Sequence, residues 1–253
     1  MSRALISLTP AESKRLIAKS VARLPEVLNA MEHGRIIVVR GSTTTIVVEE
    51  LHDILYPEGR FLAGYVGSGG FLRTPKDTRK KNLILVKGQP VEMTTAEALA
   101  AFEKNDVFIK GANMLDPQGV AGGMLGSDTG GTTGESMGIL MAKGSHIIIP
   151  VGLEKLVPNV PDIVGLFGNR VFDFVTGDPV GVMPIVGGHV VNELEAFRIL
   201  FSVKAYHVGG GGIDGAEGAI NVIIEGSKTE VEVAFQLVET IKGEPPFEHA
   251  AGV

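Results

Sequence analysis

The sequence has no cysteine, no long apolar run and no excess of positive charge. Without cysteine the chain forms no disulfide, has no thiolate nucleophile and binds no metal through sulfur. No stretch reaches the roughly 18 apolar residues that a membrane-spanning helix needs, and the first residues lack the apolar core of a signal peptide. A net charge of −6 argues against a nucleic-acid-binding surface. We therefore expect a cytoplasmic protein with no membrane or nucleic-acid partner.

What the chain does contain is a balanced composition rich in glycine. Hydrophobic residues make up 44% and charged residues 21% of the 253 residues, which is typical of a globular protein with a sizeable core. The 34 glycines fall largely in segments between apolar runs. This distribution suits an α/β protein whose loops bind a ligand.

Strand-like and helix-like segments alternate through the first two thirds of the chain. Thr9-Pro10-Ala11-Glu12 predicts a helix start with Thr9 as N-cap. Short apolar runs predict buried strands at residues 35–39, 83–86, 106–109 and 146–151. Segments with helical periodicity lie between these runs. This order predicts an α/β ligand-binding domain with a parallel sheet over residues 1–178.

The remaining segments follow a different order. Strands are predicted at residues 182–186, 204–208 and 219–225, and helices at 192–201 and 229–242. The resulting β-α-β-β-α order predicts a small α+β domain of ferredoxin type over residues 179–243, followed by a frayed tail at 244–253.

A glycine, a serine and three threonines follow the first predicted strand directly. They are Gly41, Ser42, Thr43, Thr44 and Thr45, and a helix is predicted behind them. The free N–H groups and the dipole of a helix N-terminus favour an anion. The alternative is a plain turn with a capping hydroxyl.

A longer candidate site lies between residues 110 and 134. Lys110-Gly111-Ala112-Asn113 ends a predicted strand, with Asp116 close behind. A loop rich in Gly, Ser and Thr then leads to a helix predicted over residues 136–143, and its candidate anion-binding residues are Gly130, Gly131, Thr132 and Thr133. The alternative is a flexible surface loop, although loops this long in compact domains are usually functional.

Glu135 is the carboxylate of most interest, because it stands where this loop meets its helix. It either caps free N–H groups or faces a ligand and moves a proton.

Three motif matches lack their structural context. Residues 210–215 match G-x-G-x-x-G but precede a strand rather than a helix, and residues 126–132 have P-loop glycines without the lysine. Residues 134–138 match G-x-S-x-G, so a serine hydrolase using Ser136 with Asp162 and His189 or His207 stays a minor alternative. The six histidines are dispersed, so we expect no metal site and no cofactor.

These residues resemble the ribose-5-phosphate isomerase, glucosamine-6-phosphate deaminase and CoA-transferase-like superfamily. Type A ribose-5-phosphate isomerases are the closest in pattern over most of residues 12–242. Gly41-Ser42-Thr43 resembles their phosphate loop, Gly111-Ala112-Asn113 their Gly-Ala-Asp motif, and Glu135 with Ala142-Lys143 their catalytic glutamate and following Ala-Lys. Val182-Met183-Pro184-Ile185 resembles the start of their small lid domain.

The resemblance implies a Rossmann-like sheet with flanking helices, a small ferredoxin-like lid and a homo-oligomer. It also implies a small anionic, phosphorylated ligand and Glu135 as general base of an isomerase-like reaction. The chain departs from the family at Lys110 and Asn113, where aspartates are typical, and at Asp128 or Thr129, where a loop lysine is typical. These departures favour a second hypothesis, a non-catalytic ligand-binding or regulatory protein on the same fold.

Overall fold

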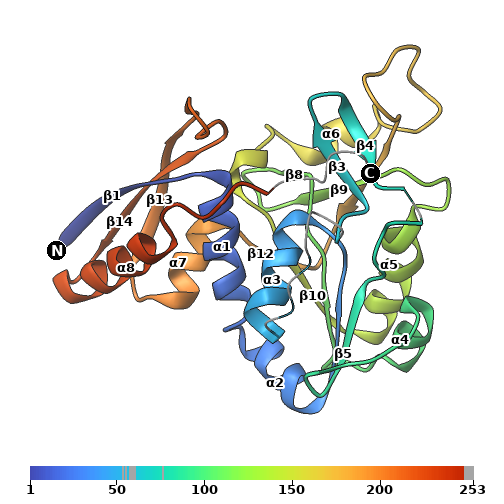
Figure 1. Ribbon diagram of the computed structural model, residues 1–253, viewed down its shortest axis with the longest axis horizontal. Helices are drawn as coiled ribbons and strands as arrows, with labels where there is room; N and C mark the ends of the chain where they lie inside the picture. Colours follow the sequence, from blue (N-terminus) through green and yellow to red (C-terminus); the bar gives the residue numbers. More distant parts are fainter. Residues whose placement is uncertain (53, 55, 57–60, 76, 248–253) are drawn as a thin grey trace.

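A six-stranded mixed sheet forms the centre of the protein, and helices cover both of its faces (Figure 1). The computed structural model describes residues 1–52, 54, 56, 61–75 and 77–247. The strand order is β12-β10-β7-β2-β5-β6. The strands are β12 (His189–Val191), β10 (His146–Pro150), β7 (Val107–Ile109), β2 (Arg35–Val38), β5 (Leu83–Val86) and β6 (Gln89–Pro90). The fold is therefore mixed α/β.

The strand directions differ in part from the predicted parallel sheet. The strands β2, β7, β10 and β12 are parallel to one another. The strand β5 is antiparallel to β2, with Arg35 opposite Val86 and Val38 opposite Leu83. The prediction is wrong for β5 because an apolar run marks burial on both faces but does not encode direction.

Helices on both faces exclude water from the strands. In Figure 1 one group lies on one side of the sheet: α1 (Pro10–Val21), α2 (Pro25–His33) and α3 (Ser42–His52). The other side carries α4 (Thr95–Ala101) and α5 (Gly131–Lys143). The side chains of Ile36, Phe108 and Ile149 consequently have no exposed surface.

The helix starts follow their local signals. Thr9 caps α1 in the predicted capping box, since its hydroxyl accepts the Glu12 N–H and the Glu12 carboxylate accepts the Thr9 N–H. Thr94 and Glu97 form the same box at α4. The helical segment that begins after Thr9 is followed by a second helix, because Pro25 begins α2.

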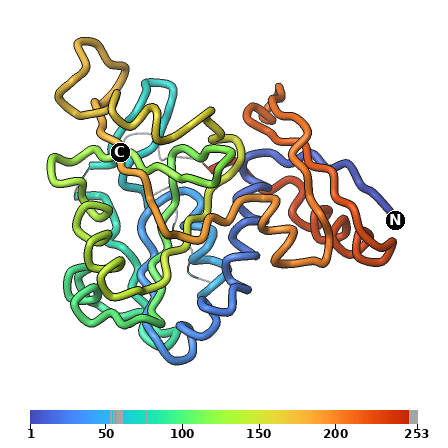
Figure 2. The backbone as a smooth tube through the Cα atoms, turned by 180° about the vertical axis from the view of Figure 1, so that it is seen from behind, coloured from blue at the N-terminus to red at the C-terminus, as the bar shows by residue number. Residues whose placement is uncertain are grey.

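A small antiparallel sheet lies beside the six-stranded sheet in both views (Figures 1 and 2). Its order is β1 (Ser2–Leu8), β14 (Ile220–Gly226), β13 (Lys204–Gly210), and it packs with α7 (Glu193–Leu200) and α8 (Lys228–Ile241). The N-terminal strand β1 was not predicted. The strands predicted at residues 204–208 and 219–225 are confirmed as β13 and β14, which pair with each other.

The segment predicted to open the small domain belongs elsewhere. The strand β11 (Gly181–Ile185) pairs with β9 (Ala121–Leu125), which also pairs with β8 (Met114–Leu115). The strand predicted at residues 182–186 is therefore present, but its predicted place in the small domain is wrong, because β1 and not β11 joins the small sheet. The domain boundary near residue 178 stays a prediction.

The strand β9 runs through part of the predicted glycine loop. A Cβ at Gly122 would lie 2.6 Å from Cγ of Met114, so a glycine is needed where the two strands approach. Three shorter connections complete the fold: the hairpin of β3 (Gly64–Gly67) with β4 (Gly70–Arg73), the 3₁₀-helix η2 (Leu153–Lys155) and α6 (Val160–Val164). Residues 171–175 form no strand.

Candidate functional site

The loops that follow the four parallel strands meet at one end of the sheet. They are residues 40–42 after β2, 110–113 after β7, 152–155 after β10 and 192–193 after β12. From β2 the chain goes to β5 on one side, and it later crosses to β7 on the other side. The switch point of the topology therefore lies between β2 and β7, where open α/β sheets place their ligands.

The predicted cradle after β2 is a helix N-terminus, as expected. The helix α3 starts at Ser42. The Thr44 hydroxyl donates to the Val39 carbonyl at 2.6 Å, and the Thr45 hydroxyl donates to the Gly41 carbonyl at 2.8 Å. These hydroxyls hold the turn, while Thr43 is buried. Ser42 is half-buried, which leaves its hydroxyl as the one available to a ligand at this helix start.

Two arginines lie together beside this helix start. The Arg40 guanidinium donates to the Lys80 carbonyl at 3.0 Å, and its buried Nε has no hydrogen-bond partner in the described part of the chain. Arg79 Nε donates to the Thr74 carbonyl at 3.1 Å. Burial, followed by repulsion from Arg79, lowers the pKa of Arg40; burial, followed by repulsion from Arg73, lowers the pKa of Arg79.

Sequence reasoning missed this arginine pair. Arg79 belongs to residues 74–81, a segment with several basic residues. They lead into β5, and because β5 is antiparallel to β2, its start lies at the same end of the sheet as the end of β2. No local signal marks the approach, since it depends on the direction of β5.

Two lysines lie together at the end of β7. Lys110 Nζ donates to the Gly111 carbonyl at 3.0 Å, and Lys155 Nζ, on η2, donates to the Ala112 carbonyl at 3.1 Å. Burial, followed by repulsion from Lys155, lowers the pKa of Lys110 to about 8. Burial also lowers the pKa of Lys155, although Glu154 at 4.0 Å opposes the shift. We call Arg40, Arg79, Lys110 and Lys155 the cationic edge.

A buried carboxylate lies behind the cationic edge. Glu193, the first residue of α7, has no exposed surface. One of its oxygens accepts the Leu153 N–H at 2.9 Å, while Oε1 has no partner among the described residues and points at Gly152. Burial raises the pKa of Glu193 to about 7.

Asn113 and Asp116, both predicted to bind ligand, hold backbone groups. Asn113 Oδ1 accepts the Met124 N–H at 3.0 Å. The Asp116 carboxylate accepts N–H groups of Gln118, Val120 and Val160 at 2.9–3.0 Å. Burial raises the pKa of Asp116, but these N–H groups outweigh it and the pKa is lowered. The two side chains support the β8–β9 hairpin.

The predicted loop before α5 is a tight helix start. Gly130 is the N-cap with a left-handed backbone (φ 74°), and Gly131 opens the helix. A Cβ at Gly134 would lie 2.2 Å from the Thr129 carbonyl oxygen, so the turn requires glycine. Thr133 is buried, and Thr132 is half-buried with its carbonyl accepting the Ser136 hydroxyl at 2.6 Å.

Glu135 lies on the exposed side of α5 and has no hydrogen bond or ion pair to any described residue. Lys143, which follows it at the interval typical of the isomerases, caps α4. Its Nζ donates to the carbonyls of Leu99, Ala100 and Phe102 at 2.7–3.1 Å. This lysine is therefore bound to backbone groups.

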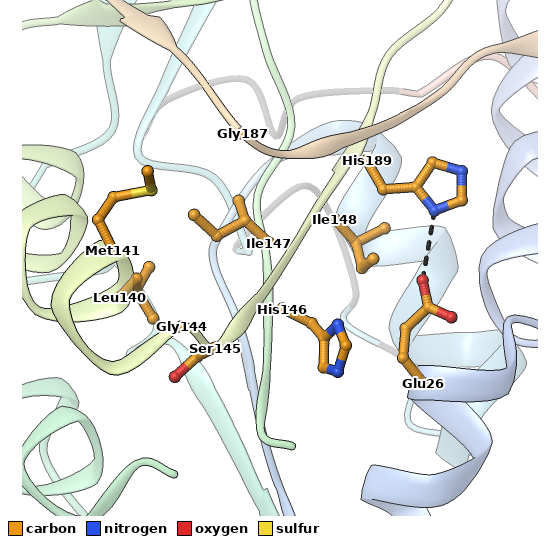
Figure 3. A pocket seen from close by; sticks show the side chains of 10 residues that line it. All are labelled: Glu26, Leu140, Met141, Gly144, Ser145, His146, Ile147, Ile148, Gly187 and His189. Atoms are coloured by element: carbon orange, nitrogen blue, oxygen red, sulfur yellow. Dashed lines mark hydrogen bonds and ion pairs between the residues drawn. The ribbon is translucent and has the colours of Figure 1, made fainter. Parts of the chain in front are cut away.

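The residues of the hydrolase alternative have other partners. Ser136 is fully buried and its hydroxyl donates within its own helix. His189 contacts Glu26 at 3.3 Å (Figure 3) and Glu195 at 2.9 Å. Neither arrangement is that of a serine activated by histidine.

Two cavities lie away from the cationic edge. One, of about 330 Å³, is near the starts of β10 and β12 and is lined by Met141, His146, His189 and neighbouring residues (Figure 3). The other, of about 550 Å³, lies between α7 and β13. None of the predicted ligand-binding residues lines either of them.

The chain matches no protein-family model and has no significant match among curated proteins. In the part of the chain that the structure describes, no helix is both long and apolar enough to cross a membrane. The same residues contain no group of three or more His, Asp or Glu arranged to hold a metal ion.

Proposed function

We propose that the protein binds a small phosphorylated metabolite at the cationic edge. The observation that carries this proposal is the presence of two like-charged pairs, Arg40 with Arg79 and Lys110 with Lys155, at the ends of neighbouring parallel strands. Partly buried like charges repel and destabilise the fold. An anionic ligand between them supplies the missing counter-charge.

The start of α3 supports the same proposal. Its free N–H groups point to the end of the sheet where the cationic edge lies, and Ser42 adds a hydroxyl there. Guanidinium groups donate in a fork that suits phosphate oxygens. A carboxylate ligand would use the same donors with fewer contacts, so a phosphate is the better fit.

Thermal unfolding with ribose 5-phosphate, inorganic phosphate and an uncharged pentose tests the proposal. A phosphorylated ligand at a hundred times its Kd stabilises by about 2.7 kcal/mol, which raises Tm by roughly 5–10 °C. Arg79→Gln and Ser42→Ala are expected to weaken binding, the arginine variant by about tenfold or more.

Arg3→Gln is the matched control, because Arg3 pairs with Glu225 in the small sheet with a side chain that is 70% exposed. It is expected to keep the full ligand-induced shift. A Tm that no phosphorylated compound changes, or a shift that Arg79→Gln and Ser42→Ala leave intact, would contradict the proposal.

A second proposal adds isomerase-like proton transfer by Glu135. It is favoured by the exposure of Glu135 on α5, whose N-terminus lies at the end of the sheet where the parallel strands finish. Glu135→Gln is then expected to abolish isomerisation while leaving the ligand-induced shift in place. A wild-type protein that binds sugar phosphates without turning them over would instead be a ligand-binding or regulatory protein.

A further inference from the structure

We infer that Lys110 is a nucleophilic amine that forms an imine with the carbonyl group of an anionic metabolite. This inference deepens the function proposed above and rests on it, because the cationic edge would hold the anionic group of the same compound. It assigns the substrate class: small aldehydes or ketones that carry a phosphate or a carboxylate.

Lys110 is a half-buried residue whose amine lies against the backbone of β9. Its Nζ lies against Gly123 of β9, where a Cβ would be only 2.9 Å away. A side chain at position 123 would therefore meet the amine, and the glycine lets Lys110 Nζ approach the backbone of β9. The amine also stands at the end of β7, next to the switch point of the sheet.

The charges around Lys110 favour its neutral, nucleophilic form. Among the described residues it forms no ion pair with a carboxylate, and the cation that faces it is Lys155. At its pKa of about 8, about a quarter of the amine is unprotonated at pH 7.5, whereas an ordinary lysine is about a thousandth unprotonated. A buried lysine beside a second cation is a recurrent way to activate an amine.

Lys143 shows what a lysine with a structural role looks like in the same chain. Its Nζ donates to three carbonyls at the end of α4, so all three N–H groups have acceptors. Among the described residues, Lys110 Nζ donates to a single carbonyl, that of the next residue. The Lys110 amine therefore has hydrogen-bonding capacity left for a bound molecule.

The reaction needs no oxidant or metal. The lone pair of Lys110 Nζ attacks the carbonyl carbon, and the carbonyl oxygen takes up a proton to give a carbinolamine. The hydroxyl oxygen then takes up a second proton from solvent, the carbon–oxygen bond breaks and one water molecule leaves, and the nitrogen, which keeps its remaining proton, forms the carbon–nitrogen double bond of a protonated imine. The protonated imine acidifies the neighbouring carbon, which is how lysine imines assist proton transfer or carbon–carbon cleavage.

Borohydride trapping tests the inference on the wild-type chain. The protein is incubated at pH 7.5 with dihydroxyacetone phosphate or with pyruvate, reduced with sodium borohydride, and analysed by intact mass and peptide mapping. We expect one adduct per chain, located at Lys110, and no adduct in Lys110→Arg. Lys228→Arg is the matched control, because Lys228 is an exposed lysine on α8 (82% side-chain exposure), and it is expected to trap like the wild type.

A second variant separates a reactive amine from one that merely packs. Lys155→Met removes the positive charge next to Lys110, so the pKa of Lys110 moves back toward the ordinary value of about 10.5. The other charged groups near Lys155 are Glu154, Lys14 and Glu193. We expect trapping at pH 7 to fall several-fold and to recover at higher pH.

Two failures can be told apart. If phosphate raises Tm but adducts are absent or spread over exposed lysines, the imine inference is wrong while the proposed binding stands. If neither a thermal shift nor an adduct is seen, both are wrong. An unchanged pH profile in Lys155→Met would also overturn the inference.

Discussion

Two buried carboxylates show how hydrogen bonding decides the state of a charged side chain. The Asp116 carboxylate accepts several backbone N–H groups, and its pKa is lowered in spite of its burial. The Glu193 carboxylate accepts the Leu153 N–H and keeps one oxygen unpartnered among the described residues, and burial raises its pKa to about 7. The two residues therefore affect stability in opposite directions as pH changes.

Glu193→Gln is expected to stabilise the protein at pH 8. The pKa of Glu193 is higher in the folded state (about 7) than in the unfolded state (about 4.5). The wild type therefore loses stability as pH rises from the lower to the higher of these values, and its stability stays reduced above the higher one. The amide removes this loss, which amounts to about 3 kcal/mol at most.

Urea unfolding at pH 5 and pH 8 measures this effect. The difference between Glu193→Gln and the wild type should be large at pH 8 and small at pH 5. Glu232→Gln, at a glutamate on α8 with a 57% exposed side chain, should differ little at either pH. An equal effect of Glu193→Gln at both pH values would refute the pKa assignment.

Asp116→Asn is expected to destabilise the protein by about 2–4 kcal/mol at pH 7, because the amide turns an N–H donor toward backbone N–H groups. The pKa of Asp116 is lowered, so its stabilising effect is present above the unfolded-state pKa of about 3.8 and is lost as pH falls below it. Unfolding curves of the variant and the wild type should therefore converge in acid. Asp162→Asn, at an exposed aspartate on α6, serves as the control.

At the scale of elements, helix starts were predictable because their signals are local. The Thr9 and Thr94 capping boxes involve residues only three positions apart. Their tertiary roles differ, however, and the sequence does not show this. Glu12 is buried and also contacts Lys242 at 2.9 Å and the Gly243 N–H at 3.1 Å, whereas the hydrogen-bond partner of Glu97 is Thr94.

These two glutamates form a matched pair for mutation. Glu12→Ala is expected to cost about 2–4 kcal/mol, since it leaves the buried groups of α1 and the end of α8 unpaired. Glu97→Ala is expected to cost clearly less, because its site is exposed. Chemical denaturation measures both, and equal losses would contradict the role of Glu12 in joining α1 to α8.

Strand pairing was less predictable than helix starts. The apolar runs located β2, β5, β7 and β10, but their neighbours are set by contacts far away in the chain. The strand β9 was interpreted as a loop because Gly122 and Gly123 lower strand propensity. Glycine stands at these two positions because the side chains of Met114 and Lys110 approach the backbone closely there.

At the scale of the whole molecule, strands far apart in the sequence, β1 and β14, pair in one sheet. The strand β1 pairs along its full length with β14, and Ser7 Oγ donates to Asn221 Oδ1 at 2.6 Å (Figure 1). A short N-terminal strand with alternating burial is hard to recognise without its partner. The homo-oligomer implied by the resemblance stays a prediction.

Deleting residues 1–8 is expected to weaken the small sheet selectively, because β14 would lose one of its two partner strands and the core side chains Ile6 and Leu8. Hydrogen exchange should show lost protection in residues 220–226, and thermal unfolding should show a lower Tm. Residues 107–109 in the central sheet should stay protected. Unchanged protection of β14 would show that β1 adds little to it.

The candidate site was predictable only where its residues follow strands in sequence. Ser42 and Lys110 were found because each stands directly after an apolar run. Arg40 and Arg79 were not, since their proximity depends on the direction of β5. Asn113 and Asp116 were assigned to ligand because a polar residue after a strand looks the same whether it binds a ligand or a backbone N–H.

The measurement that tests the central claim most directly is an amide NMR titration with ribose 5-phosphate. It reports on each backbone N–H without any substitution. Saturable shifts concentrated at Gly41, Ser42 and Gly111 are expected, with little change near the cavity at His146 and His189 (Figure 3). Shifts confined to that cavity, or no shifts at millimolar ligand, would contradict binding at the cationic edge.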